Sequence, residues 1–340
     1  MLDGSKTLLS TKHFNFQVKH LLVIGVLAIS FSTAFIIRSY PIKYGYFLNE
    51  FDPYFDYRAT KYIVDNGLEA YLNWHDTMSW YPEGRNVPAT SQTGLHIVAA
   101  YLYLVFGAGS SLQDFVIILP VVLGSLTTIA IFALVRRLKG TSAGLFAALF
   151  FAFTPAIIQR GNLGWFKSEP LGLFLGIIAT YLFVSAIKGR QVKFVILKAV
   201  AAGFLLGLAN ASWGGIQYFA IPLSIFFVAI PFFRKDLAIP LLVAICITIL
   251  TLVTAGIFPR PGISFVFGPP GLALMGGTVF LAAAFLVRKL TSADHSIRNT
   301  GIVLAAFIAI SIGVMLAQAY YSPSFRYLNA IKITRNLRIS

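Results

Sequence analysis

The chain has 340 residues, of which 57% are hydrophobic and only 11% are charged. Soluble globular domains carry about 25% charged residues, so this composition excludes a soluble enzyme, a disordered chain and a disulfide scaffold. The net charge is +15, from 27 Lys and Arg against 12 Asp and Glu. In a membrane protein such an excess first indicates cytoplasmic loops, and no nucleic-acid partner is expected.

Nine apolar runs approach the roughly 20 residues that a membrane-spanning helix needs. In chain order they are Val18–Ile37, Phe115–Val135, Thr141–Ile158, Pro170–Ile187, Phe194–Ala209, Gly214–Pro231, Leu237–Phe258, Val266–Val287 and Gly301–Ala319. A tenth run, Gly94–Phe106, is shorter and is expected to be an interfacial or packed helix. We therefore predict an all-α, polytopic membrane helix bundle with about nine transmembrane helices. The first run is too long for a signal-peptide core, so it is expected to be a retained signal anchor.

Basic residues fix the predicted orientation of the chain. With the N-terminus inside, every short inner loop of the nine-helix arrangement is basic, as the positive-inside rule expects. The residues concerned are Arg136, Arg137, Lys139, Lys188, Arg190, Lys193, Arg234, Lys235, Arg288, Lys289 and Arg298. A tenth span at residues 94–106 would turn all of these outward. We therefore predict a cytoplasmic N-terminus and an extracytoplasmic C-terminus.

Acidic residues then collect outside the membrane. The longest external loop, residues 38–114, contains eight of the nine external acids and many aromatic residues. Aromatic rings are common at the membrane interface, so many of these rings need no functional role. A lone cysteine, Cys246, lies in an apolar run, so no intrachain disulfide is expected.

Three carboxylates crowd the start of this loop: Glu50, Asp52 and Asp56. Carboxylate oxygens are natural ligands of Mg²⁺ or Mn²⁺, and unpaired charge is costly at a membrane surface. The sequence Asp52-Pro53 is also typical of a helix start, with Asp52 as N-cap and Pro53 in the first turn. The two roles are compatible.

A second polar segment, Arg160–Pro170, falls between the third and fourth spans on the same predicted side. It contains Glu169, the one predicted external acid beyond the long loop. Gly161 and Gly164 allow a close approach of the backbone. An ordinary turn before a helix is the alternative interpretation of this segment.

Together these residues resemble a known family. Glu50–Tyr62, Leu72-Asn-Trp74 and Trp80–Arg85 resemble the first external loop of the oligosaccharyltransferase catalytic subunit, more closely in its archaeal and eukaryotic forms than in its bacterial ones. The likeness continues more loosely through Arg160–Glu169, Ser212–Gly215 and Ser324–Asn329. It implies a membrane glycosyltransferase of the GT-C type.

The resemblance implies an activity and its partners. Such enzymes catalyse protein N-glycosylation by moving an oligosaccharide from a dolichyl phosphate or pyrophosphate lipid to the asparagine of an Asn-X-Ser/Thr acceptor polypeptide. The implied location is the membrane, with the active face extracytoplasmic: the cell membrane of an archaeon or the endoplasmic reticulum of a eukaryote.

The resemblance also implies roles for individual residues. Asp52 and Arg160 correspond to catalytic positions, and Asp52 and Glu169 to ligands of a divalent metal, expected to be Mg²⁺ or Mn²⁺. Glu50 and Asp56 are candidate supporting acids. Candidate contacts to the lipid phosphate or substrate are Lys167, Trp80, Tyr81 and Arg85.

The chain departs from the family in two respects. Lys167 stands where the family has the first acid of an acidic pair, and a protonated lysine cannot ligate a metal. Its ammonium group could neutralise Asp52 and Glu169, or it could bind the lipid phosphate, and the sequence does not rank these roles. The family's later spans, catalytic Glu and soluble domain are also missing. Residues 1–340 are therefore expected to be a truncated transmembrane domain, inactive alone.

Two other functions stay open at this point. One is another lipid-linked sugar transferase of the GT-C type, such as a protein O-mannosyltransferase. The other is a transporter, which usually has ionisable groups near the membrane midplane. The predicted spans carry almost no charge beyond Lys19 and Lys198, near their inner ends, and this favours chemistry at the membrane surface.

Overall fold

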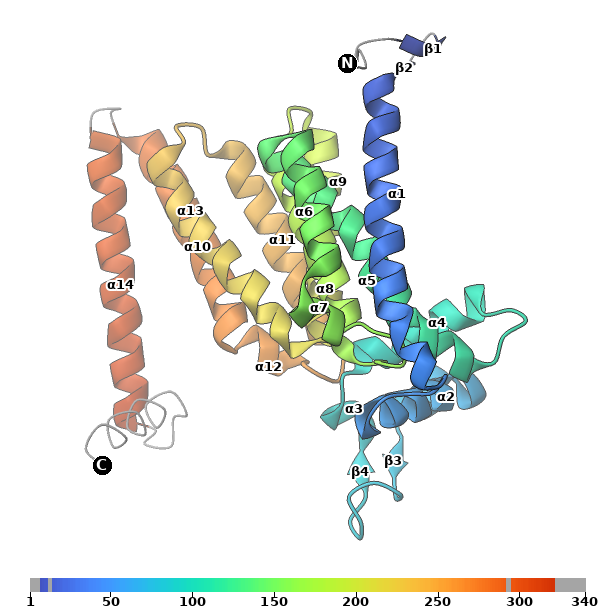
Figure 1. Ribbon diagram of the computed structural model, residues 1–340. Coiled ribbons are helices and arrows are strands. Elements are labelled where there is room, and N and C mark those ends of the chain that lie inside the picture. Colours follow the sequence, from blue (N-terminus) through green and yellow to red (C-terminus); the bar gives the residue numbers. More distant parts are fainter. Residues whose placement is uncertain (1–6, 12–13, 292–294, 322–340) are drawn as a thin grey trace, which may run out of the picture.

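The computed structural model describes residues 7–11, 14–291 and 295–321, which form a bundle of long helices with most of the shorter elements at one end and one strand pair at the other (Figure 1). The elements in chain order are β1 (Thr7–Thr11), β2 (Phe14–Gln17), α1 (Val18–Ser39), η1 (Tyr40–Tyr44), α2 (Phe51–Leu72), β3 (His75–Asp76), β4 (Arg85–Asn86), α3 (Val87–Thr90), α4 (Thr93–Phe106), α5 (Leu112–Lys139), α6 (Thr141–Phe153), α7 (Pro155–Gln159), α8 (Ser168–Ile187), α9 (Val192–Ser212), η2 (Gly214–Ile216), α10 (Gln217–Phe233), α11 (Ala238–Ile257), α12 (Ile263–Val266), α13 (Pro269–Leu290) and α14 (Ser296–Tyr321). The two short strand pairs are antiparallel. The prediction of an all-α membrane bundle is confirmed.

Seven helical segments in the described part of the chain are long and apolar enough to cross a membrane. They are α1 with η1, α5, α8, α9, η2 with α10, α11 and α13. The chain is therefore an integral, multi-pass membrane protein. The predicted count of nine is not confirmed, because the two remaining runs form α6 and α14, whose apolar described parts are shorter.

The run at residues 141–158 is divided, and its sequence explains why. Proline disfavours helical geometry in the residue before it. Thr154, directly before Pro155, is extended, with φ −67° and ψ 113°, so α6 ends at Phe153 and Pro155 begins α7. The two helices together follow the direction of their long neighbours (Figure 1).

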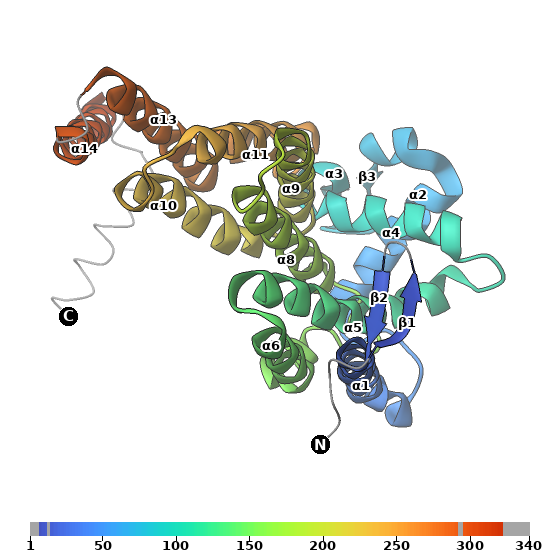
Figure 2. The ribbon, with the colours of Figure 1, turned by 90° about the horizontal axis from the view of Figure 1, so that it is seen from above.

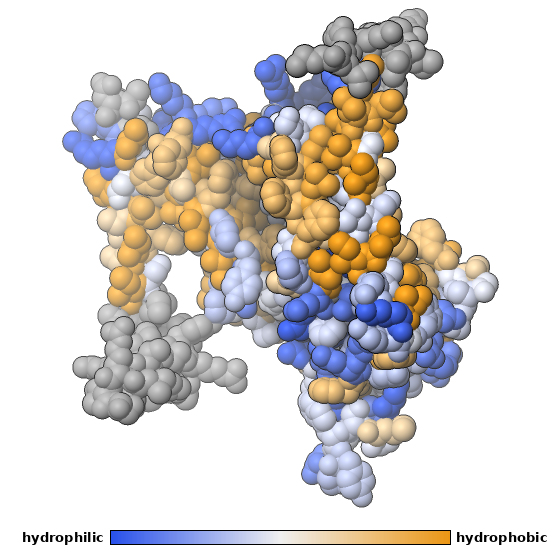
Figure 3. Space-filling view, viewed as in Figure 1, coloured by the Kyte–Doolittle hydropathy of each residue, from blue (hydrophilic) through white to orange (hydrophobic). Residues whose placement is uncertain are grey.

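The basic loops lie together at one end of the bundle. Lys188 donates to the carbonyl of Arg137 over 2.7 Å, Arg234 to the carbonyl of Ile187 over 3.3 Å, and Arg288 to the carbonyl of Lys235 over 2.7 Å. Figure 3 shows this hydrophilic edge above a hydrophobic band. The structure thus has the one-sided charge distribution on which the predicted orientation rests.

The opposite end carries residues 40–111, here called the cap. The cap lies on the α1 side of the bundle, away from α13 and α14 (Figure 2). Its helix α4 has 14 residues and packs on α2 with Ala99 and Ala100 fully buried. A Cβ on Gly94 would come within 2.6 Å of the Ala211 backbone at the end of α9, so α4 also seats closely on the bundle. This arrangement agrees with the packed helix predicted there.

Candidate functional site: a cationic pocket under the cap

Hydrogen bonds join the two polar segments that the sequence singled out. Asn49 donates its backbone N–H to the carbonyl of Gly164 over 3.0 Å and its side-chain amide to the carbonyl of Leu163 over 2.6 Å. Gly164 in turn donates to Ile117 in α5, and Leu163 donates to the carbonyl of Arg38 at the end of α1. Residues 45–50 and 160–167 are therefore held together against the bundle. We call them the Asn49 loop and the Lys167 loop.

Gly164 is the point of closest approach between these loops. It has φ +79°, and a Cβ there would lie 2.2 Å from the carbonyl oxygen of Phe47. Glycine alone fits both constraints without strain. The close approach expected from the sequence is thus found at Gly164.

The backbone at Glu50 turns sharply before α2. Glu50 has φ 64° and ψ 176°, a region that is almost restricted to glycine and costs about 1–3 kcal/mol for other residues. Glu50 is consequently the N-cap, and α2 begins at Phe51. The expectation that Asp52 caps the helix is wrong by two residues: Asp52 lies in the first turn, and Pro53 after it is tolerated because the first N–H groups of a helix have no partner within the helix.

Lys167 links the two loops through its charge. Its Nζ lies 2.7 Å from Asp52 Oδ2 and 3.8 Å from Glu50 Oε2, and 4.9 Å from the centre of the Trp165 ring. Burial by itself would lower the pKa of Lys167, but the hydrogen bond and charge of Asp52, with the charges of Glu169 and Glu50, raise it above its ordinary value. Lys167 is therefore a fixed positive charge, and Asp52 remains about half exposed to a substrate.

Arg160 pairs with the other acid. Its NH1 donates to Glu169 Oε1 over 3.3 Å, and its guanidinium lies 5.1 Å from the Trp165 ring centre. The second oxygen of Glu169 is buried and has no hydrogen-bond partner. Both residues line a cavity of about 310 Å³ that also reaches Trp213. Arg160 and Glu169 thus form a pair in a cavity that Asp52 does not line.

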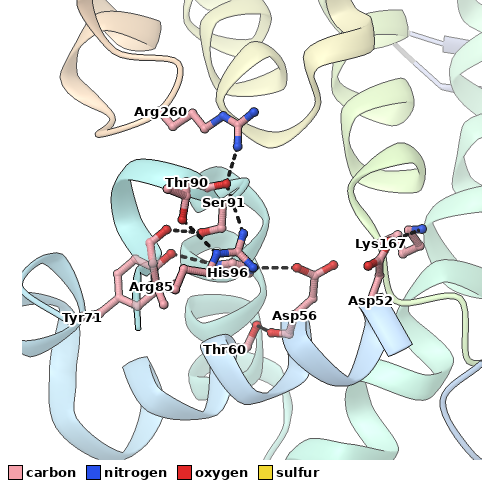
Figure 4. Close-up of polar contacts among 11 residues, drawn as sticks. Asp52, Asp56, Thr60, Tyr71, Arg85, Thr90, Ser91, His96, Lys167 and Arg260 are labelled. Carbon is pink, nitrogen blue, oxygen red and sulfur yellow. Dashed lines mark hydrogen bonds and ion pairs between the residues drawn. The ribbon is translucent and has the colours of Figure 1, made fainter. Parts of the chain in front are cut away.

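Asp52 opens onto a larger, separate pocket of about 520 Å³. The residues that line it are Phe51, Asp52, Phe55, Asp56, Ser79, Trp80, Arg85, Thr90, Ser91, Gln92, Lys167, Ser168 and Arg260. Three of these are cations, which come from the cap, from the Lys167 loop and from the loop after α11 (Figure 4). We call this cavity the cationic pocket.

The cations of this pocket are held in place by the cap. Arg85 lies over the rings of Phe55, at 4.1 Å, and Trp80, at 4.8 Å, and its Nε donates to Thr90 Oγ1 over 2.9 Å. Arg260 donates to the carbonyl oxygen of Thr90. The structure thus brings Arg85 and Trp80 to the pocket with Lys167, as the sequence suggested. Tyr81 is 88% exposed and does not line it.

Asp56, the other candidate supporting acid, lines the cationic pocket and is also hydrogen-bonded to the interior of the cap. Its carboxylate accepts a hydrogen bond from Nε2–H of the fully buried His96 over 2.8 Å, and His96 Nδ1 then accepts from the Tyr71 hydroxyl over 2.7 Å (Figure 4). Burial raises the pKa of Tyr71, which keeps that hydroxyl protonated. This network joins α2 to α4. The sequence did not single out His96, Tyr71 or Arg260, since no local spacing marks them.

The predicted Mg²⁺ or Mn²⁺ ion needs several oxygen donors at one point. Within the described residues, no group of three His, Cys, Asp or Glu side chains is placed to hold a metal. Asp52 is ion-paired with Lys167, and Glu169 with Arg160, and the two acids line different cavities. The residues present therefore do not fit a divalent cation.

Comparison with known proteins identifies the chain. Residues 21–263 match the family model described as "Oligosaccharyl transferase STT3, N-terminal". The chain belongs to this family. Two curated STT3B subunits are similar to it: the one from Arabidopsis thaliana is 28% identical over 93% of the chain and 45% of the relative, and the one from Oryza sativa subsp. japonica is 31% identical over 59% and 28%. The chain thus spans less than half the length of these relatives.

Solved structures agree with the STT3 assignment at the level of the fold. The archaeal oligosaccharyltransferase AglB from Archaeoglobus fulgidus, in complex with an inhibitory peptide and a dolichol-phosphate, has a TM-score of 0.72 and 24% identity over 93% of the chain and 39% of that protein. The same enzyme tethered to an acceptor peptide with an NVT sequon gives 0.70 at 23% identity, over 89% and 38%. Its complex with Zn and sulfate gives 0.67 at 22% identity, over 87% and 39%. The predicted GT-C fold is therefore confirmed.

Proposed function

We propose that this chain is the N-terminal portion of an oligosaccharyltransferase that moves an oligosaccharide from a dolichyl-linked phosphate donor to the asparagine of an Asn-X-Ser/Thr acceptor. The observation that carries the proposal is the junction of the Asn49 and Lys167 loops, which sets Asp52 at the rim of the cationic pocket. Membership of the STT3 family favours this activity over O-mannosyl transfer and over transport.

The reaction has two requirements, and the site offers a group for each: the carboxylate of Asp52 and the cations of the cationic pocket. An amide nitrogen is a poor nucleophile because its lone pair is delocalised into the carbonyl group. The half-exposed carboxylate of Asp52 accepts a hydrogen bond from the side-chain amide of the acceptor asparagine and turns that amide out of conjugation. The phosphate of the donor gains negative charge as the sugar leaves, and fixed cations lower the energy of that state. Arg85, Lys167 and Arg260 supply those cations.

The place of the pocket suits a lipid donor. The cationic pocket lies between the cap and the end of the bundle opposite the basic loops, so the isoprenoid chain can remain in the membrane while its phosphate reaches the cations (Figures 1 and 4). We propose that this end is extracytoplasmic, in keeping with the charge distribution of the loops.

Donor binding by the 340-residue chain tests the proposal. Native mass spectrometry of the protein in detergent should detect bound dolichyl phosphate but not dolichol. Arg85→Gln should weaken that binding by about 10- to 150-fold, the loss expected when one charge-assisted contact of about 1.5–3 kcal/mol is removed. The matched control is Arg190→Gln, an exposed arginine at the opposite end, which should bind normally. Equal binding of dolichol and dolichyl phosphate would contradict the proposal.

Transfer itself is tested in a fusion of this chain to the remaining part of the Arabidopsis thaliana relative. Mass spectrometry should find the glycan on asparagine of a sequon peptide, and Asp52→Asn should reduce the rate by at least about 100-fold, the usual weight of a residue that acts in the transition state. Sugar on Ser or Thr would support the O-mannosyl alternative. Unchanged transfer by Asp52→Asn would remove Asp52 from the reaction.

A further inference from the structure

The positive charge beside Asp52 is a side chain of the protein itself, the ammonium group of Lys167. Lys167 Nζ sits between Asp52 Oδ2 and Glu50 Oε2, at 2.7 and 3.8 Å. We propose that the Lys167 ammonium group takes the place of a divalent metal ion at this point, so that Asp52 is positioned without a bound metal. This inference rests on the proposed function only in treating Asp52 as a reacting group.

The geometry makes Lys167 a suitable positioning residue for Asp52. Its side chain is 16% exposed and lies beside the Trp165 ring, so the ammonium group has little freedom to leave. An ammonium group offers three N–H donors, and two carboxylates face it, Glu50 at the end of the Asn49 loop and Asp52 in the first turn of α2.

The same geometry works against a metal ion. A divalent cation at Asp52 would lie within a few ångströms of the ammonium group and would be repelled by it. Such an ion needs six or more oxygen ligands, and Lys167 supplies none where a carboxylate would have supplied one or two. Glu169 does not compensate, because one of its oxygens is paired with Arg160 and its side chain lines the neighbouring cavity, whereas Asp52 lines the cationic pocket. Lys167 therefore both holds Asp52 and excludes the ion.

Binding of Mn²⁺ tests this without any measurement of activity. The 340-residue chain in detergent is titrated with Mn²⁺, and the free ion is followed by electron paramagnetic resonance. We expect no saturable binding by the unchanged chain below about 1 mM, the weak end of protein Ca²⁺ sites. Lys167→Asp should bind one Mn²⁺ at least about tenfold more tightly than the unchanged chain, because it exchanges a repelling charge for a ligand.

Two further variants locate the effect. Lys167→Asp combined with Asp52→Asn should lose the gained affinity. Lys43→Asp, an identical charge change at an exposed lysine of the cap whose ammonium group lies against Tyr40 and Tyr44, should bind no better than the unchanged chain. Circular dichroism and a single elution peak establish that each variant is folded.

Stoichiometric Mn²⁺ binding by the unchanged chain that Asp52→Asn abolishes would overturn the inference. So would a folded Lys167→Asp that gains no affinity. If Lys167→Asp does not fold, Mn²⁺ binding by the unchanged chain and by Asp52→Asn still tests the inference. Binding of Mn²⁺ at Asp52 contradicts the inference, and the absence of such binding supports it. A failure of oligosaccharide transfer leaves these outcomes unaffected, so the two proposals fail separately.

Discussion

Single buried charges in the cap are stabilised by several partners at once. Asp76 is 2% exposed, forms an ion pair with Arg58, and accepts hydrogen bonds from the Ser79 hydroxyl and from the Met78 N–H, the last over 3.0 Å. Burial by itself would raise the pKa of Asp76, but these hydrogen bonds and the charge of Arg58 lower it below its ordinary value. Asp76 thus fastens the β3–β4 hairpin to α2.

The lowered pKa makes this contribution pH-dependent. The stability that Asp76 contributes is present above its unfolded pKa of about 3.9 and is lost as the pH falls through the lower folded value. Asp76→Asn should therefore lower the melting temperature of the detergent-solubilised chain by several degrees at pH 7, since hydrogen bonds to charged groups contribute about 1.5–3 kcal/mol each. The deficit should shrink below about pH 4, as scanning fluorimetry across pH would measure.

Asp65→Asn is the control for that series, because Asp65 forms an exposed ion pair with Lys61 on the same helix. Surface ion pairs of this kind contribute little. A deficit for Asp76→Asn that stays constant from pH 3 to pH 7 would show that its charge is not what stabilises the hairpin.

At the scale of elements, the site exists because loops distant in the sequence are hydrogen-bonded side by side. Asn49 pairs with Leu163 and Gly164 across more than a hundred residues, and this pairing sets the N-terminus of α2 beside the start of α8. Sequence pattern predicted that both segments were functional and that Gly164 allowed a close approach. It could not predict their pairing, because hydrogen bonds between irregular loops leave no periodic signal.

Gly164→Ala tests this junction. Alanine would be strained at φ +79° by about 1–2 kcal/mol, and its Cβ would also clash with the Phe47 carbonyl, adding about 1–3 kcal/mol. Gly109→Ala is the matched control, since Gly109 has φ +89° but nothing within 4 Å of a Cβ. Scanning fluorimetry should therefore record a clearly larger fall in melting temperature for Gly164→Ala. Equal falls would mean that the loops are not in close contact.

At the scale of the whole molecule, the cap and the basic loops occupy opposite ends of the bundle (Figures 1 and 3). The positive-inside rule then predicts that the cap is extracytoplasmic. This orientation depends on the number of membrane spans before each loop, so it requires that α6 and α7 together cross the membrane. It applies to the described helices from α1 to α13.

Cysteine labelling tests this orientation. In a Cys246→Ser background, Met78→Cys in the cap should react with a membrane-impermeant maleimide in intact cells, because Met78 is 81% exposed. Arg190→Cys, in an exposed basic loop, should react only after the membrane is permeabilised. The background protein controls for unspecific labelling. The reverse pattern would invert the predicted topology.

The sequence by itself determined the fold class and the family, and it singled out two of the segments that line the candidate site. Apolar length and loop charge are local properties, so the long spans and the basic ends could be predicted from composition along the chain. Apolar length also predicted nine spans. In the structure Pro155 divides one of these runs, and seven segments of the described chain meet the length and hydropathy requirement.

Only the tertiary structure decided which charges meet. Sequence reasoning placed Asp52 and Glu169 on one metal ion and left the role of Lys167 open. In the folded chain Lys167 pairs with Asp52, Arg160 pairs with Glu169, and Asp56 turns to the buried His96. The physical reason is that an ion pair depends on a few ångströms of separation. For Lys167 and Asp52, which are more than a hundred residues apart, that separation is set by the packing of the loops on the bundle.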